Sequence, residues 1–386
     1  MNSQFDLVIV GGGFVGSALA IALRQTALRV AVIEKMPALA SFSHDKRSIV
    51  LSHSSHLILQ RLGLWSLLRP HTTTIASIQT SQAGHFGMTT LSAEEEKIPA
   101  LGYVISGGFL LQTLMEAASA CANVTVFRAA NVASMRREGG GWKVDVEQEG
   151  ELISLQSPWL VAADGTHSMV RNFLNIEVET FDYQQTAIVS SVSLSRDHQH
   201  KAYERFTKEG AIAFLPQAGN RAGLVWSAPT QEAQSLLDLS DDEFLKRVQA
   251  AFGFRLGRFV AIEKRFNYPL QLLRAKKVAV EGCFLLGNAA NTLHPIAAQG
   301  FNLGLRDAYE LAALWQEESS KVDLVEQYRN KRQVDQKRTS EFTHGLVRFF
   351  EINNPALSIF RGIGAFMIDQ IPPLKHVIAR LTTKAQ

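Results

Sequence analysis

Cysteine is scarce in this chain: its 386 residues include only Cys121 and Cys283. Two cysteines provide neither a disulfide framework nor a cysteine cage for a metal ion, so we expect each to be a small core residue. An excess of one charge is also lacking, because 39 Lys and Arg residues stand against 36 Asp and Glu residues, a formal net charge of +3. This balance excludes a dedicated nucleic-acid-binding arm but leaves contact with a membrane surface open.

Long apolar runs are lacking too, since no stretch reaches the roughly twenty residues that a membrane-spanning helix needs. Residues 7–23 come nearest, but glycine and serine interrupt them and no basic region precedes them, as a signal peptide requires. We interpret this stretch as a strand, a glycine turn and a buried helix. The protein is therefore expected to be cytoplasmic, with peripheral contact at the inner face of the membrane still open.

The N-terminal segment has the pattern of a dinucleotide-binding βαβ unit. Residues 6–10 predict a buried parallel strand, residues 17–26 a helix and residues 29–33 a second strand. Between the first strand and the helix lies G-x-G-x-x-G, made by Gly11, Gly13 and Gly16.

Each part of this motif has a physical role. Gly11 permits the tight turn, Gly13 lets a pyrophosphate approach the backbone, and Gly16 lets the helix pack closely on the sheet. Glu34 ends the second strand, where a carboxylate accepts hydrogen bonds from an adenosine ribose and repels a 2′-phosphate. The pattern predicts FAD or NAD rather than NADP; the alternative, a plain βαβ unit, leaves the terminal acid unexplained.

Two later motifs follow apolar strands. Residues 159–163 predict a strand that runs into Asp164 and Gly165, where an acid suits a ligand crevice, although Asp164 could also serve only as a turn residue. Arg171 would face back toward a phosphate or this acid. Residues 287–304 are rich in small side chains and precede an amphipathic helix at 305–316, whose N-terminal end could stabilise a negatively charged flavin ring.

Taken together, these motifs resemble the class A flavoprotein aromatic hydroxylases, and within them the ubiquinone-biosynthesis hydroxylases. The resemblance covers essentially the whole chain and is carried by GGGFVG with Glu34, DKR, ADGTHSMVR and GNAANTLHPIAAQGFNLG. Members usually have Gly-Asp where this chain has Gly287-Asn288, and an asparagine can still hydrogen-bond there. The third motif is similar to the branch acting on 2-polyprenyl-6-methoxyphenol, which implies hydroxylation of ring carbon C1.

The resemblance also implies roles for single residues. Arg47 would lie beside the flavin (alternatively, it is a solvated loop cation), Gln112 would reach the cofactor, and Val132 would contact adenine through its backbone. Within the third motif, Asn288, Gly300 and Asn302 are assigned to cofactor binding. The remaining candidates there form the catalytic group: His294, Pro295 and Gln299. His294 is the candidate acid or base, although a structural histidine explains the same position.

The implied reaction is monooxygenation. NAD(P)H would reduce FAD, a flavin C4a-hydroperoxide would form with O2, and its distal oxygen would pass to a polyprenyl phenol ring. We expect no catalytic triad and no metal, and electrons would come from transiently bound NAD(P)H or from a partner. The alternatives are another flavoenzyme of isoprenoid or aromatic chemistry, such as a reductase or an epoxidase, and a flavoprotein scaffold in a ubiquinone-biosynthesis complex.

The predicted fold is α/β, with a doubly wound parallel sheet that binds FAD and an inserted antiparallel sheet that binds substrate. Residues 1–72, 100–180 and 270–340 are assigned to the discontinuous FAD-binding domain, with 1–72 and 100–180 as parallel-sheet units. Residues 73–99 and 181–269 are assigned to the substrate domain, with a turn at Gly219-Asn220. Residues 341–386 form a basic helical segment that either caps the main domain or lies on a membrane or partner.

Overall fold

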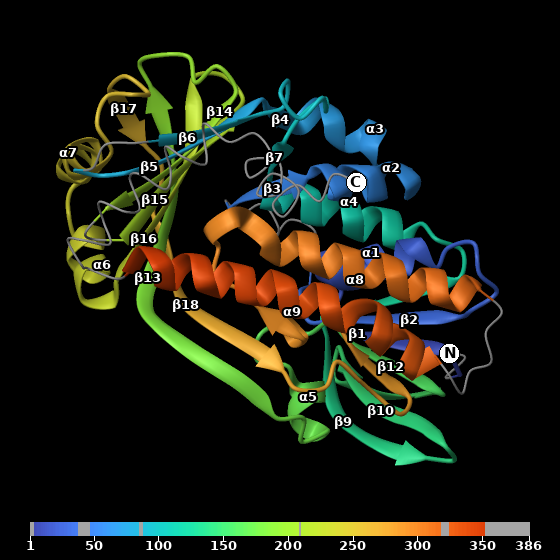
Figure 1. The fold of residues 1–386 in the computed structure, drawn as a ribbon. Helices are drawn as coiled ribbons and strands as arrows, with labels where there is room; N and C mark the ends of the chain where they lie inside the picture. Colours follow the sequence, from blue (N-terminus) through green and yellow to red (C-terminus); the bar gives the residue numbers. More distant parts are fainter. Residues whose placement is uncertain (1–3, 38–46, 85–87, 208–209, 318–323, 352–386) are drawn as a thin grey trace.

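The computed structural model describes residues 4–37, 47–84, 88–207, 210–317 and 324–351 (Figure 1). A mostly parallel sheet surrounded by helices and a larger, mostly antiparallel sheet lie at opposite ends of the view. This arrangement confirms the predicted α/β fold with an additional antiparallel sheet.

The parallel sheet has the strand order β19-β20-β12-β1-β2-β8. Its strands are β1 (Leu7–Val10), β2 (Val30–Glu34), β8 (Val124–Arg128), β12 (Trp159–Ala162), β19 (Ala279–Val280) and β20 (Cys283–Leu285). The three central strands β12, β1 and β2 are buried at every position, which is why each reads as an unbroken apolar run. Only β19 runs antiparallel, as the edge strand of a hairpin. Helix α1 (Phe14–Ala22) packs against α4 (Gly107–Ser119) and α8 (Gln299–Gln316) beside this sheet.

Two small antiparallel sheets correct the expectation that residues 1–72 and 100–180 are parallel-sheet units. One contains β9 (Ala130–Glu138), β10 (Gly141–Gln148) and β11 (Glu151–Ser157); the other contains β3 (Ser48–Ser52), β7 (Gly102–Ser106) and β4 (Thr72–Ile75). Tight turns at Gly139-Gly140 and Glu149-Gly150 join the strands of the first sheet, and all four residues have positive φ. Such turns reverse the chain at once, whereas a parallel pair needs a long crossover.

The large sheet has the order β21-β18-β13-β16-β15-β14-β5-β6, with β17 paired to β13. Its strands are β5 (Ser77–Gln82), β6 (Met88–Ser92), β13 (Val178–Leu194), β14 (Lys201–Thr207), β15 (Gly210–Gln217), β16 (Arg221–Pro229), β17 (Phe259–Ile262), β18 (Phe266–Ala275) and β21 (Asn291–Thr292). The predicted turn at Gly219-Asn220 joins β15 to β16. Side chains of α6 (Thr230–Leu237) and α7 (Asp241–Phe252) share an apolar cluster with one face of this sheet.

The remaining helices connect these sheets. They are α2 (His53–Arg61), α3 (Trp65–Leu68) and α5 (Met169–Phe173), with short 3-10 turns η2 (Arg69–His71), η3 (Gly287–Ala289) and η4 (Ile296–Ala298). The last described helix, α9 (Leu324–Glu351), runs without interruption through the boundary predicted at residue 341. Residues 352–386, which hold most of the predicted basic tail, lie outside the described residues.

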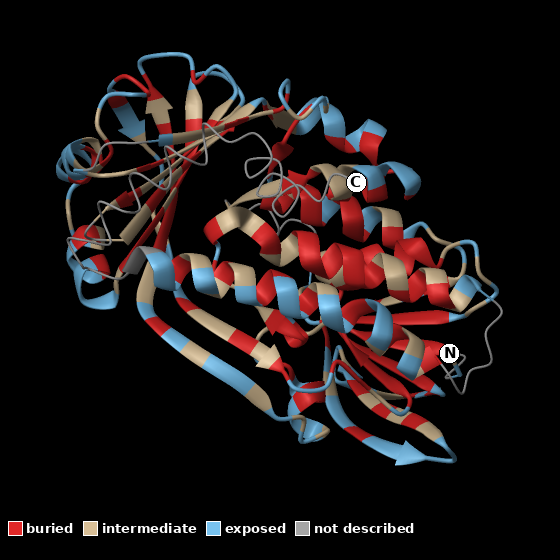
Figure 2. Ribbon diagram, viewed as in Figure 1, coloured by how far each residue is buried: buried red, intermediate tan, exposed pale blue. Residues whose placement is uncertain are grey.

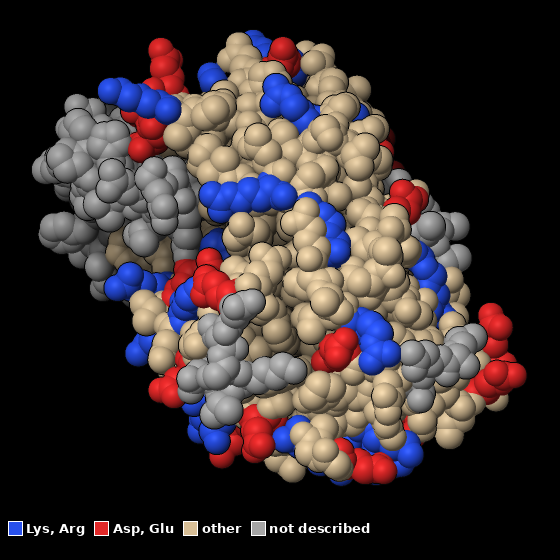
Figure 3. Space-filling model, turned by 90° about the vertical axis from the view of Figure 1, so that its right-hand side faces the viewer, with Lys and Arg blue, Asp and Glu red and all other residues tan. Residues whose placement is uncertain are grey.

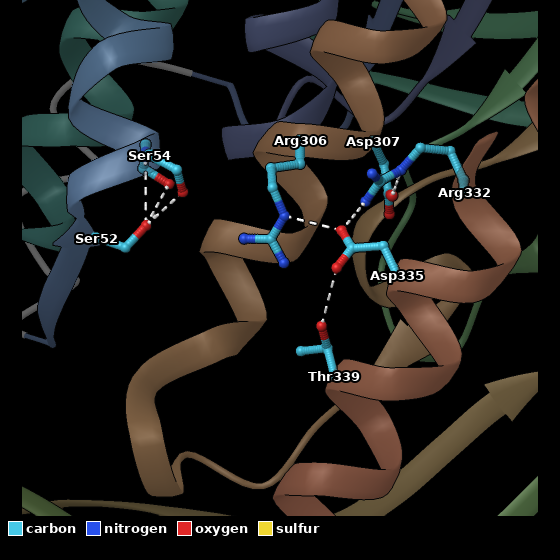
Figure 4. A network of polar contacts seen from close by, with 8 residues as sticks. Ser52, Ser54, Arg306, Asp307, Arg332, Asp335 and Thr339 are labelled. Carbon is cyan, nitrogen blue, oxygen red and sulfur yellow. Dashed lines mark hydrogen bonds and ion pairs between the residues drawn. The ribbon is translucent and has the colours of Figure 1, made fainter. Parts of the chain in front are cut away.

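Helices α8 and α9 are joined by a buried charge network (Figure 4). Arg332 Nε donates to Asp307 Oδ1 at 2.6 Å, and Arg332 Nη2 donates to Asp335 Oδ2 at 2.7 Å. Arg306 Nε donates to the same Asp335 oxygen at 2.9 Å. Two cations and two carboxylates thus neutralise one another between the helices, and in Figure 2 red bands of buried residues recur along both.

The surface and the cysteines agree with the composition. On the face shown in Figure 3, Lys and Arg side chains are scattered among Asp and Glu rather than gathered into one basic patch. Both cysteines are free; Cys283 is buried in β20 and Cys121 is partly buried. Within the described chain, no helix combines the length and apolar character needed to cross a bilayer.

We predict that Asp307→Ala lowers the free energy of unfolding by about 3 kcal/mol, because the buried Arg332 loses the carboxylate that its Nε contacts. Urea denaturation measures this change. Lys337→Ala is the control, since it removes only an exposed ion pair with Glu341 and should change the free energy by less than about 0.5 kcal/mol. Equal effects of the two substitutions would contradict the assigned importance of the buried network.

Candidate functional site

The glycine motif after β1 has three different environments. Gly11 has φ +101°, and a Cβ there would lie 2.3 Å from the carbonyl oxygen of Ala163. A Cβ on Gly16 would lie 1.9 Å from the Gly11 oxygen, so both positions require glycine for the chain to close on itself. A Cβ on Gly13 would meet no atom of the described residues within 4 Å. The backbone is therefore open to a ligand at the start of α1.

Glu34 lies at the carboxyl end of β2 and is buried, with 7% of its surface exposed. Its Oε2 accepts a hydrogen bond from the backbone N–H of Gly12 at 2.8 Å, and its Oε1 accepts one from Met36 N–H at 2.9 Å. These bonds fix the carboxylate against the glycine loop. Each carboxylate oxygen retains acceptor capacity for a further donor, such as a ribose hydroxyl.

Asp164 and Gly165 follow β12 at the same edge of the sheet. Asp164 Oδ2 accepts hydrogen bonds from the backbone N–H groups of Met169 and Val170 at the start of α5. The other oxygen, Oδ1, is buried and has no hydrogen-bond partner among the described residues. Gly165 has φ +86°, and a Cβ there would meet nothing within 4 Å. An acceptor and an open backbone thus stand side by side.

Arg171 connects this loop to the third motif. Its Nη1 donates to the carbonyl of Ala289 at 2.9 Å and its Nη2 to the carbonyl of Thr166 at 2.8 Å. Burial lowers the pKa of Arg171, partly offset by the charge of Asp164. The side chain therefore binds backbone oxygens and holds the two loops together, near the acid that the sequence suggested as its partner.

Two threonines that sequence reasoning missed strengthen the same connection. Thr292 Oγ1 donates to Thr166 Oγ1 at 3.0 Å, and the amide of Asn288 is 3.5 Å from that hydroxyl. Both threonines lie inside motifs that the sequence singles out, but nothing in their spacing indicates that they meet. Asn288 itself is exposed beside the Asp164 loop.

The turn before α8 adopts a costly backbone conformation. Ala297 and Ala298 both have positive φ, at 60° and 49°, although neither is glycine. Pro295 precedes them and is exposed, while a Cβ on Gly300 would meet nothing within 4 Å in the part of the chain that the structure describes. Strained non-glycine turns of this kind concentrate at ligand sites, because the surrounding structure must hold them in place.

His294, Gln299 and Asn302 point into the protein. His294 Nδ1 accepts a hydrogen bond from Ile296 N–H at 3.1 Å, and its Nε2 lies 3.2 Å from Gln185 Oε1. Burial lowers the pKa of His294 to about 4, so the imidazole is neutral near pH 7. This bonding matches the structural alternative for His294, and its catalytic assignment stays a prediction.

Gln299 and Asn302 bond to backbone groups. Gln299 Nε2 donates to the carbonyl of Ala297 at 3.1 Å, inside the strained turn. Asn302 Oδ1 accepts from Ser52 N–H at 2.9 Å, and its amide donates to the carbonyl of Val50 at 2.9 Å. Asn302 therefore links α8 to β3, and its side chain helps to fix the position of the start of α8.

The three residues carried over by resemblance lie in different surroundings. Arg47 stands between two rings, 6.0 Å from the centroid of Phe14 and 5.6 Å from that of Tyr268. This position, between the glycine-loop helix and the large sheet, is where a cofactor-contacting cation is expected. Gln112 is exposed on α4 and donates to Glu116, and Val132 is partly buried in β9. Their contacts with a cofactor stay predictions.

These observations together test whether FAD fits the chain. Three loops come together around the starts of α1, α5 and α8. They contain the open backbone at Gly13, Gly165 and Gly300, the Glu34 carboxylate, and the buried Asp164 oxygen that has no partner among the described residues. Backbone N–H groups at a helix start suit a pyrophosphate, and carboxylates suit ribose or ribityl hydroxyls. The donor and acceptor set fits a flavin dinucleotide.

Comparisons with known proteins point the same way. A family model described as an FAD binding domain matches residues 4–343. Ubiquinone hydroxylase UbiL of Rhodospirillum rubrum is 31% identical over 97% of this chain and 88% of its own length. The 3-demethoxyubiquinol 3-hydroxylase of Escherichia coli is 29% identical over 97% of both chains.

A solved structure supports the fold. The p-nitrophenol 4-monooxygenase PnpA of Pseudomonas putida superimposes with a TM-score of 0.83 over 99% of both chains. Its 16% sequence identity makes this a likeness of fold alone.

We predict that Glu34→Ala reduces the flavin content of the purified protein, because the ribose loses its acceptor and the glycine loop loses its anchor. The ratio of flavin absorbance to protein absorbance measures the occupancy. Asp6→Ala serves as the control, since Asp6 precedes β1 at the opposite end of the strand and accepts from Arg29 N–H. Full occupancy in Glu34→Ala would exclude the ribose role.

The burial of His294 predicts how the free energy of unfolding depends on pH below neutrality. Because its folded pKa of about 4 lies below the unfolded value, the unfolded chain binds more protons between pH 6.5 and pH 4. The contribution of neutral His294 to the free energy of unfolding is therefore fully present above about pH 6.5 and is lost as the pH falls. The loss is about 2 kcal/mol at pH 5. His294→Asn should show a smaller loss between pH 7 and pH 5 in urea denaturation, whereas substitution of the exposed His167 should leave the loss unchanged.

Proposed function

Since this chain belongs to the family of proteins with an FAD binding domain and is an FAD-dependent monooxygenase, we propose that it hydroxylates a polyprenylated phenol in ubiquinone biosynthesis. The observation that carries the proposal is the match, over nearly the whole chain, to two relatives named as ubiquinone-pathway hydroxylases. The loops at the carboxyl edge of the parallel sheet, with their open glycines and acceptor oxygens, support the same conclusion.

FAD, when bound, supplies the redox and oxygen-transfer chemistry. The chain itself provides binding and orientation. Glu34 and the Gly11–Gly16 loop hold the dinucleotide end, and Asp164 offers its partnerless oxygen to a hydroxyl of the cofactor. The turn at Ala297 and Ala298 directs the start of α8 toward the same space, so its free N–H groups can stabilise negative charge. NAD(P)H is proposed as the transient electron donor.

The finer proposal is that the substrate is 2-polyprenyl-6-methoxyphenol and that the hydroxyl is added at the position numbered C1 in the quinone pathway, a ring carbon that carries hydrogen in this phenol. Its support is the sequence Gly287-Asn288 and the motif that follows. The Escherichia coli relative is named for a different ring position, which makes hydroxylation at another carbon the competing outcome. Because such a substrate is itself a lipid, we propose that the protein works in the cytoplasm with peripheral contact at the membrane, within a complex of pathway enzymes.

Quinone analysis of cells that lack the gene tests the pathway. We expect 2-polyprenyl-6-methoxyphenol to accumulate and ubiquinone to fall, because the ring hydroxyl at C1 is no longer added. Re-expression of the wild-type chain should restore ubiquinone, and the Glu34→Ala chain should restore less. Normal quinone content without the gene would overturn the pathway assignment.

A scaffold without catalysis is distinguished by a separate measurement. Purified protein with its flavin should consume O2 when supplied with NAD(P)H and a prenylated phenol. Flavin that is never reduced under these conditions would favour the scaffold.

A further inference from the structure

One face of the large sheet, here called the inner face, looks toward the cofactor loops. Ala187, Val189, Phe206, Ala211 and Val225 belong to it, because they alternate along their strands with residues that pack against α6 and α7. Ile296, from the turn before α8, joins the same apolar cluster. The inner face is thus in direct contact with the third motif.

A second set of contacts joins the inner face to Arg47. Tyr268 pairs with Ala187 and therefore lies on this face, and the Arg47 guanidinium is 5.6 Å from its ring centroid. Gln217, at the end of β15, donates to Ser48 Oγ at 3.0 Å, one residue after Arg47. The inner face therefore forms a wall of the space that the cofactor loops border.

Glu204 is an acid among mostly apolar and small residues of the inner face. It lies on β14 between Ala202 and Phe206 on the same side, and its strand partners are Ala213 of β15 and Thr80 of β5. Two apolar clusters meet at this point, one containing Phe206 and Ala211 and the other containing Ala202 and Ile78. Both cross-strand neighbours of Glu204 have small side chains.

The Glu204 carboxyl has no hydrogen bond or ion pair with any residue that the structure describes. Burial raises its pKa to about 7, although the side chain is only half-buried. The apolar clusters that contain Ala202 and Phe206 flank the carboxyl group on its own strand, which accounts for the desolvation. An acceptor in apolar surroundings needs a donor, and the residues that the structure describes provide none there.

Among the residues that the structure describes, few charges lie near Glu204. None of the residues of β4, β5, β6, β7 or β15 is charged. Other described titratable groups on the inner side come from other elements and have partners of their own. Arg47, which precedes β3, lies against the ring of Tyr268. Arg221 of β16 bonds to Glu263, His294 to Gln185, and Tyr183 to His344 of α9. Burial alone accounts for the raised pKa.

We propose that Glu204 accepts the hydrogen bond of the substrate's ring hydroxyl and thereby selects a phenol, a proposal that rests on the proposed function. The phenol O–H donates to a carboxylate oxygen, and no bond is broken in binding. A hydroxyl that shares its proton with a carboxylate leaves more electron density on the ring, which hydroxylation of an aromatic carbon requires. The apolar clusters on either side of Glu204 suit the methoxy group and the first prenyl unit.

The test uses the purified, flavin-loaded protein and two probes, 2-geranyl-6-methoxyphenol and its O-methyl ether. The ether keeps the shape of the phenol but lacks the donor. Titration calorimetry at pH values from 6 to 8 gives the dissociation constants for the wild type and for Glu204→Gln. We expect the wild type to bind the phenol roughly tenfold more tightly than the ether, and more tightly as the carboxyl ionises near pH 7.

Glu204→Gln keeps a neutral amide oxygen as an acceptor but cannot ionise, so it should prefer the phenol less strongly than the wild type does, with no dependence on pH over this range. The control Glu232→Gln changes an exposed acid on α6, beyond the opposite face, and should behave as the wild type. Equal binding of phenol and ether by the wild type would overturn the role of Glu204 while leaving the hydroxylase function intact. If neither probe binds at any pH, the phenol class and the role of Glu204 are overturned together.

A thermal measurement shows that the variant is folded and tests the desolvation of the Glu204 carboxyl group. The folded chain holds the Glu204 proton up to about pH 7, so ionisation destabilises the folded state as the pH rises from about 4.5. Glu204→Gln lacks this cost, and its Tm should exceed that of the wild type at pH 8 by more than it does at pH 5. A Tm difference that is the same at both pH values would contradict the desolvated position of the carboxyl.

Discussion

The close contact between α1 and α8 is the constraint on which the site depends. A Cβ on Gly304 would lie 2.6 Å from Val15 Cγ2 and 3.1 Å from Gly287 Cα. Without side chains at 287 and 304, the third motif can lie directly on the helix that follows the first motif. The first and third motifs, which are far apart in the sequence, thereby border one space. A methyl group at Gly287 or Gly304 would push the two motifs apart.

The strained turn before α8 follows from this contact. Positive φ at Ala297 and Ala298 persists only if the elements on both sides are held. On the far side, Asn302 ties α8 to β3, and the buried Arg306, Asp307, Arg332 and Asp335 tie it to α9. Polar contacts remote from the cofactor loops therefore maintain the conformation of the loop that closes the site.

Local patterns in the sequence predicted much of this architecture. The strand, glycine turn and helix at the N-terminus, the acid ending β2 and the loop after β12 all follow from short-range periodicity and turn chemistry. The sequence did not predict the buried charge network between α8 and α9. Arg306 and Arg332 belong to amphipathic helices, and the charged residues of such helices usually face water. Only the packing of α9 on α8 turns these charges inward.

Glu204 shows the other limit of sequence reasoning. In the run Ala202-Tyr203-Glu204-Arg205-Phe206, either alternating set could face the core, because each contains one aromatic and one charged residue. The register with Ala213 and Thr80 decides the question, and register depends on contacts far along the chain. His294 is similar: its motif suggested chemistry, but its burial and its hydrogen bonds are visible only in three dimensions.

The central claim is that this chain inserts an oxygen atom from O2 into a prenylated phenol. Incubation of the flavin-loaded protein with NAD(P)H, 2-geranyl-6-methoxyphenol and ¹⁸O2, followed by mass spectrometry of the product, tests it most directly. We expect a product with a hydroxylated ring that carries one ¹⁸O atom. A hydroxylated product without the label, or consumption of NAD(P)H with the phenol left unchanged, would contradict it.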